Sequence, residues 1–176
     1  MLEIPIPPQE IWDPVKENFI KYDGGVIKME HSLRAIQKWE AKYKKPFLSK
    51  EEKTEEEVLF YLKCMTLNKV EDVAYSLLTN SDMESISNYI SEQRTATTVK
   101  TSSKGSRKVP TAEVMYYWLS ALQIPFEVAD WHLSQLLTLV EVANELNNPK
   151  KMKKSEVYNQ YDALNEMRKA KYKTKG

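Results

Sequence analysis

The stretch His31–Phe47, HSLRAIQKWEAKYKKPF, decides the fold because it joins a helical pattern to an abrupt proline stop. Its apolar residues recur at helical spacing on one face, formed by Leu33, Ile36 and Tyr43 with Trp39 at its edge. Pro46 should end the helix, since a proline drives the preceding residue out of the helical region. A second segment, Thr111–Phe126 (TAEVMYYWLSALQIPF), ends on the same Pro-Phe pair. Both segments indicate helices that pack and stop.

Composition is typical of a single globular domain. The chain has 176 residues, of which 41% are hydrophobic and 29% charged, and only 4 glycines. A lone cysteine, Cys64, cannot form an intrachain disulfide, and its helical surroundings favour a buried hydrophobe over a nucleophile. No apolar run approaches the ~18 residues that span a bilayer. No basic region precedes the first apolar residues, as it would in a signal peptide. We therefore expect no membrane association and a cytosolic location.

Residues 1–29 are predicted to form an N-terminal arm with a short β-hairpin. Phe19–Tyr22 and Val26–Met29 are β-prone runs joined by Asp23-Gly24-Gly25, and Asp-Gly suits a hairpin turn. The prolines before this hairpin should keep the chain extended or irregular; they are Pro5, Pro7, Pro8 and Pro14. Such an arm is too small to be stable alone, so it should lean on the helices or on a partner.

The remaining chain reads as helical, with a core domain at 30–148 and a basic helix and tail at 149–176. Thr54 with Glu57, and Ser81 with Glu84, each match a capping box. A fifth helix should bury Val114, Trp118 and Leu122. A sixth, from about Glu127 to Leu146, is apolar on several faces and should be nearly surrounded; a last helix starts at Ser155. The expected class is mainly α: a compact domain of about seven helices with a short β arm.

Residues 94–110, RTATTVKTSSKGSRKVP, do not read as regular structure. A loop of this length is uncommon and is usually functional or mobile. We expect a mobile surface loop, with ordering on a partner protein as the alternative. Nucleic-acid contact ranks below both, because the loop has no aromatic residue to stack on bases. Its basic residues are candidate partner contacts: Arg94, Lys100, Lys104, Arg107 and Lys108.

No pattern in the sequence indicates catalysis, a metal or a cofactor. His31 and His132 are far apart, and neither has a second ligand at helical or turn spacing. His132 is expected to be a hydrogen-bonded core or edge histidine, and nothing in the sequence supports a dyad between it and Cys64. Neither GxGxxG nor GxxxxGK is present. We therefore predict a protein that is not an enzyme and has no catalytic, metal-binding or cofactor-binding residues.

Aromatic residues supply further candidates for partner binding. Tyr116, Tyr117 and Trp131 lie close together in the sequence, and the two tyrosines cannot both be buried with the predicted core face. The lysine-rich tail is expected to be a solvated amphipathic helix with a frayed end. The second interpretation is a helix that docks on another protein through a stripe that includes Tyr161. The third is attraction of its lysines to nucleic acid or an acidic protein surface.

The chain resembles a family of small proteins from the tail or baseplate module of tailed bacteriophages. The resemblance covers roughly Met29–Val142, with an echo at the terminal KTKG. It rests on an ordered series of packing motifs: Trp39-Glu40, Lys45-Pro46-Phe47, Tyr116-Tyr117-Trp118, Pro125-Phe126 and Trp131-His132-Leu133. The family carries no catalytic residues to transfer.

This resemblance implies a morphogenesis protein that works by protein–protein contact. The first role is a tail assembly chaperone that holds the tape-measure protein while tail-tube subunits polymerise, in the host cytoplasm. The alternative is a minor structural or adaptor protein of the tail or baseplate, which stays in the virion. Expected partners are tape-measure, tail-tube or baseplate subunits, or further copies of the chain. A phage-encoded nucleic-acid-binding regulator is a third hypothesis.

Overall fold

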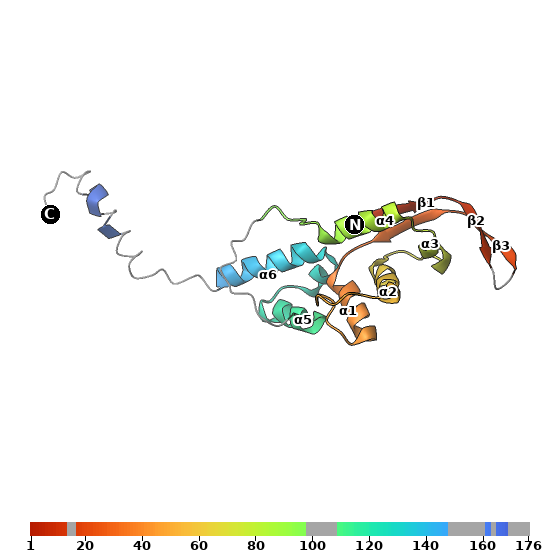
Figure 1. The fold of residues 1–176 in the computed structure, drawn as a ribbon. Coiled ribbons are helices and arrows are strands. Elements are labelled where there is room, and N and C mark those ends of the chain that lie inside the picture. Colours follow the sequence, from red (N-terminus) through yellow and green to blue (C-terminus); the bar gives the residue numbers. More distant parts are fainter. Residues whose placement is uncertain (14–16, 98–108, 148–160, 163–164, 169–176) are drawn as a thin grey trace. The chain divides into compact units, whose positions relative to one another are not determined.

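The computed structural model describes residues 1–13, 17–97, 109–147, 161–162 and 165–168. The chain divides into two units, Met1–Ala143 and Asn144–Gly176, each described by itself. The elements are β1 (Leu2–Ile6), β2 (Gln9–Asp13), β3 (Asn18–Tyr22), β4 (Gly25–Met29), α1 (Leu33–Tyr43), α2 (Glu55–Met65), α3 (Asp72–Ser76), α4 (Asn80–Ser91), α5 (Ala112–Ala121), the 3₁₀ helix η1 (Phe126–Asp130) and α6 (Leu133–Asn147). The fold is mainly helical with a small antiparallel strand set, as predicted (Figure 1).

The predicted hairpin between Phe19–Tyr22 and Val26–Met29 is wrong. Strand β3 pairs with β2, and β4 pairs with β1, in two antiparallel two-stranded sheets. Leu2 pairs with Met29 at one end and Asp13 with Asn18 at the other, in one unbroken register. The arm is therefore one long two-stranded ribbon, and the segment expected to be extended or irregular is extended and supplies half of it.

The ribbon is interrupted where Pro7 and Pro8 face Asp23 and Gly24. The prolines have no N–H to donate, so the ladder stops there. Gly24 has φ +83°, and a Cβ on it would lie 3.0 Å from the Pro8 nitrogen. The Asp-Gly pair thus makes a bend within the ribbon instead of the predicted turn.

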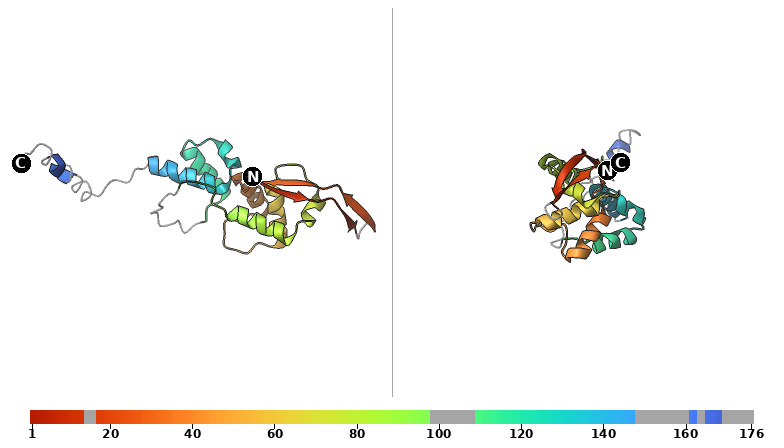
Figure 2. Two further views of the ribbon diagram at one scale, coloured as in Figure 1. Left: turned by 90° about the horizontal axis from the view of Figure 1, so that it is seen from above. Right: turned by 90° about the vertical axis from the view of Figure 1, so that its right-hand side faces the viewer.

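Strands β1 and β4 make most of the contacts between the ribbon and the core, and the buried Tyr22 of β3 belongs to the same core. Met29 forms a bridge with Thr66 after α2, and the Leu67 N–H donates to the Lys28 carbonyl at 2.8 Å. Figures 1 and 2 show β1 and β4 beside the helices, with β2 and β3 at the end of the ribbon furthest from α5 and α6. The arm therefore leans on the helices mainly through β1 and β4, with Tyr22 and Ile11 extending the contact into the β2–β3 half.

Helix α1 stops before Pro46, as predicted, and its caps are residues that the sequence analysis did not name. The Ser32 side chain accepts from the Ala35 N–H, and Lys44 ends the helix in the left-handed region at φ 56°. Trp39, predicted at the edge of the apolar face, is instead central and 2% exposed. Its indole N–H donates to the Glu57 carbonyl at 2.9 Å, which ties α1 to α2.

One predicted capping box is confirmed and the other is displaced. Thr54 and Glu57 cap α2 reciprocally, as expected. The box of α4 is formed by Thr79 and Asp82, so the assignment to Ser81 and Glu84 is wrong. Asp82 reaches the Thr79 N–H at 2.9 Å, which starts the helix at Asn80.

Helix α5 buries a different face from the one predicted. Ala112, Met115 and Leu119 are buried, whereas Val114 is exposed and Trp118 and Leu122 are half-buried. The inward face is therefore turned by one residue. Part of the reason is an anchor at the start of α5, where the buried Ala112 N–H donates to the Glu40 carboxylate at 2.7 Å.

The predicted sixth helix is broken at Trp131 and His132. Residues Phe126–Asp130 form η1, and α6 starts only at Leu133. Between them His132 forms a bridge with Ser32, and the Leu133 N–H donates to the His31 carbonyl at 2.8 Å. Helix α6 is not surrounded, because only Leu133, Leu136 and Val140 are buried among its residues.

Two predictions lie largely outside the described residues. The helix from Ser155 is described only at 161–162 and 165–168, which are helical. The loop at 94–110 is described only at its two ends. Among the helices that the structure describes, none has the length and apolar character needed to cross a bilayer.

Candidate partner-binding surfaces

The predicted aromatic candidates lie at or near the surface of α5 and η1. Tyr117 is 69% exposed and Trp131 46% exposed. Tyr116 is half-buried, and its ring meets Phe126 edge to face at 5.8 Å. Burial raises the pKa of Tyr116, so its hydroxyl stays protonated at neutral pH. These side chains offer apolar area with polar tips, the type of residue that anchors protein interfaces.

Trp131 faces outward because His132 faces inward. Trp131 has extended backbone angles of φ −73° and ψ 163°, and His132 pairs with Ser32. Successive side chains of an extended segment point to opposite sides. The break in the predicted sixth helix therefore sets the exposure of Trp131.

The other predicted candidates are mostly beyond what the structure describes. Arg94 is held in place by two contacts. Its backbone N–H donates to Ser134 Oγ at 3.1 Å, and its guanidinium lies 4.9 Å from the centre of the Tyr89 ring. The basic residues Lys100, Lys104, Arg107 and Lys108 fall outside the described residues. Tyr161, in the second unit, is exposed.

A further aromatic pair stands on the β2–β3 hairpin. Trp12 and Phe19 are direct cross-strand partners, and their rings meet edge to face at 5.1 Å. Trp12 is 51% exposed and Phe19 is 66% exposed. The pair escaped the sequence analysis because Trp12 was not assigned to a strand. The sequence feature that could have revealed the pair is the equal spacing of Trp12 and Phe19 on the two sides of residues 14–17.

The opposite face of the hairpin is also apolar. Ile11 pairs with Ile20, next to the Trp12–Phe19 pair, and alternation places both isoleucines on the other face. Both are half-buried. A two-stranded ribbon with bulky apolar pairs on both faces has more apolar surface than it can cover by itself.

The two histidines are brought together inside the fold. His132 is buried; its Nε2 lies 3.0 Å from the Tyr89 carbonyl and its Nδ1 2.8 Å from Ser134 Oγ. A carbonyl can only accept, so Nε2 carries the proton and Nδ1 accepts from Ser134. The hydrogen-bonded core histidine predicted at this position is confirmed.

His31 packs beside His132 and bonds to a buried tyrosine. Tyr61 Oη lies 2.5 Å from His31 Nδ1, and burial raises the pKa of Tyr61 well above its ordinary value. Burial, together with the nearby His132, lowers the pKa of His31 to about 4. Tyr61 therefore donates to a neutral imidazole at neutral pH, an arrangement that stabilises the fold.

Glu40 is a buried carboxylate that joins the two Pro-Phe segments. One oxygen accepts from the Phe47 N–H, just after Pro46, and the other from the Ala112 N–H at the start of α5, both at 2.7 Å. Both carboxylate oxygens are thus occupied by backbone donors. The sequence showed the two segments but not the residue that connects them.

Groups that could serve redox or metal chemistry are sparse in the described part of the chain. Cys64 is buried, and burial raises the pKa of its thiol, which disfavours the reactive thiolate. Within the described residues, no three His, Cys, Asp or Glu side chains gather as a metal site would require. The polar side chains of the core act mainly as hydrogen-bond partners for the backbone.

Comparison of the chain with protein-family models, with curated proteins and with solved structures finds no match in any of the three.

Proposed function

We propose that this protein works by binding other proteins during the assembly of a tailed phage particle, as a tail assembly chaperone for the tape-measure protein. The phage role rests on the resemblance of the packing motifs between Met29 and Val142. The binding mode rests on the exposed Trp12–Phe19 pair of the β2–β3 hairpin.

The hairpin suits a protein partner for two physical reasons. Trp12 and Phe19 each present large apolar area, and covering it removes that area from water at about 25 cal/mol per Å². In its β2–β3 half the ribbon has two strands, so the outer edges of β2 and β3 offer backbone groups to a partner strand. A partner that covers one face and one edge would gain both contributions.

The structural or adaptor role is the second candidate. The observation in its favour is the same ribbon, because a hairpin that adds to a neighbour's sheet can form a permanent joint as well as a transient one. Mass spectrometry of purified particles separates the two roles. We expect the chain to be absent from mature virions; its stoichiometric presence would overturn the chaperone role and support the adaptor.

The binding surface is tested by complementation of a phage that lacks the gene. We expect Trp12→Ala combined with Phe19→Ala to abolish the formation of tails, while the protein remains folded. Leu67→Ala is the control, since Leu67 is also an exposed apolar residue but lies outside the hairpin. Full rescue by the double variant would contradict the proposed use of the hairpin.

A further inference from the structure

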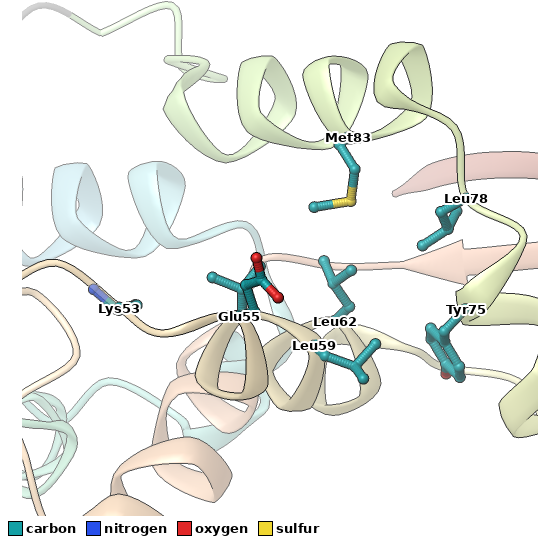
Figure 3. A pocket seen from close by; sticks show the side chains of 8 residues that line it. Lys53, Glu55, Leu59, Leu62, Tyr75, Leu78 and Met83 are labelled. Carbon is teal, nitrogen blue, oxygen red and sulfur yellow. The ribbon is translucent and has the colours of Figure 1, made fainter.

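A pocket opens between α2, the α3–α4 segment and the residues that precede α2. It has a volume of about 260 Å³, and its lining includes Lys53, Glu55, Leu59, Leu62, Leu78 and Met83. Figure 3 shows Met83 reaching from α4 toward Leu62 on α2, with Leu78 on the side of the α3–α4 connection. We refer to it as the α2–α4 pocket.

The walls of the α2–α4 pocket are apolar. Leu62 is buried, whereas Leu59 is 40% exposed beside it. Met83 is half-buried, and its unbranched, polarizable side chain can adapt to incoming groups of different shape. Apolar surface is therefore available at the pocket without opening the core.

Lys53, at one end of the pocket, already contacts two aromatic rings. Lys53 Nζ lies 4.6 Å from the centre of the Phe47 ring and 5.7 Å from that of Trp39. Such cation–π contacts stabilise the positive charge of Lys53 on the aromatic rings. Glu55, in the first turn of α2, is exposed at the pocket and presents the opposite charge.

The segment that builds most of the pocket is strongly acidic. Lys53–Ser91, which contains all the lining residues, carries seven carboxylates against three lysines, a net charge of −4. The acids of this segment are Glu55, Glu56, Glu57, Glu71, Asp72, Asp82 and Glu84. Glu56, Glu57 and Asp72 form ion pairs with lysines, whereas Glu55 lines the pocket and the other acids lie on the α3–α4 segment. This remaining negative charge favours a positively charged partner.

We propose that the α2–α4 pocket receives the apolar side chains of a basic amphipathic helix from a partner protein. Its volume is below the ~300–1,000 Å³ typical of sites that enclose small molecules, so it suits side chains presented from outside. Much of its wall is helical, where backbone groups are already paired, so an added strand would gain few hydrogen bonds. The inference requires a protein partner but not the phage role.

The probe is a fluorescent peptide of about 18 residues with leucine at helical spacing on one face and lysine elsewhere. The matched control peptide has glutamate in place of every lysine. Fluorescence anisotropy should show that the lysine peptide binds at least about tenfold more tightly than the glutamate peptide at low salt, and less tightly as salt rises. Equal binding of the two peptides would overturn the proposal.

Two pairs of variants locate the peptide. Leu59→Ser should weaken binding by about tenfold, whereas Leu67→Ser, at another exposed leucine, should not. Glu55→Lys should weaken binding by about threefold at low salt, while Glu113→Lys should leave it unchanged. Glu113 is the matched control because it is also an exposed acid in the first turn of a helix.

Thermal unfolding verifies that these surface variants remain folded. Chemical-shift changes in the NMR spectrum of the full chain should centre on the methyl group of Met83. Changes confined to Trp12 and Phe19 would place the peptide on the hairpin and overturn the pocket assignment. The two proposals are tested separately. Tail formation by the Trp12 and Phe19 double variant tests the proposed function, and binding of the lysine peptide tests the pocket, so either can fail while the other holds.

Discussion

The rings of His31 and His132 meet edge to face in the protein interior, with their centroids 5.3 Å apart. The Leu133 N–H donates to the His31 carbonyl, and Ser32 forms a bridge with His132. The starts of α1 and α6 therefore lie side by side, joined by backbone and side chains. Two histidines from distant parts of the sequence become one buried contact that constrains both helices.

This contact predicts a loss of stability in acid. His31 has a pKa of about 4 in the folded protein, below the ~6.5 of an unfolded chain. Above pH ~6.5 neither state binds the proton; between ~6.5 and ~4 only the unfolded state does, so the free energy of unfolding falls. The full effect is about 3 kcal/mol.

Urea unfolding from pH 7 to pH 4 measures this dependence, with His31→Gln as the comparison because glutamine does not titrate. His132 opposes protonation of His31 and Glu30 favours it. The difference in unfolding free energy between the two proteins should shrink as the pH falls. Parallel curves would mean that His31 is not the group responsible.

Glu40→Gln should destabilise the protein by about 2–3 kcal/mol. The amide keeps one acceptor oxygen, but its NH₂ group would face the N–H of either Phe47 or Ala112. Urea denaturation measures the change. The control is Glu56→Gln, at a side chain that is 76% exposed, where we expect less than about 0.5 kcal/mol. A similar cost for both would contradict the role of Glu40.

Trp39→Ala and Trp131→Ala should differ sharply in stability. Removing the buried indole of Trp39 leaves a cavity and removes the hydrogen bond to the Glu57 carbonyl, at a cost of about 3–5 kcal/mol. Trp131 is nearly half exposed, so we expect a cost below about 1 kcal/mol. Thermal unfolding compares them. A loss of partner binding without a loss of stability would make Trp131 an interface residue.

Gly24→Ala should cost more than Gly25→Ala. At Gly24 alanine would meet both a positive φ and backbone atoms of Ile6 and Pro8, which predicts a loss of more than ~1 kcal/mol. At Gly25 the close atom is the Tyr22 hydroxyl, at the far end of a side chain that can shift. Chemical denaturation separates them. Equal effects would show that the bend in the ribbon tolerates a side chain.

The stop of α1 and the start of α2 were predicted correctly because their signals are local. The ends of α1 and the capping box of α2 depend on residues within a few positions of each other, such as Thr54 and Glu57. The α4 box was misplaced by two residues because Thr79–Asp82 and Ser81–Glu84 match the same pattern. Sequence alone could not choose between them.

The strand pairing and the candidate surfaces were harder to predict from the sequence. Asp23-Gly24-Gly25 is a good local turn signal, but pairing across it would leave β1 and β2 without partners. Of the predicted aromatic candidates, Tyr117 and Trp131 are exposed, while the Trp12–Phe19 pair emerges only once β2 and β3 are in register.

The sequence by itself determined that α1 stops before Pro46, that Thr54 and Glu57 start α2 and that the fold is mainly helical, because periodicity and caps act over one or two turns. Tertiary structure alone decided that His31 meets His132, that Glu40 reaches Ala112 and that Trp131 faces outward. Those features depend on groups distant in the sequence that pair only when the chain is folded, since buried donors and acceptors must find partners away from water.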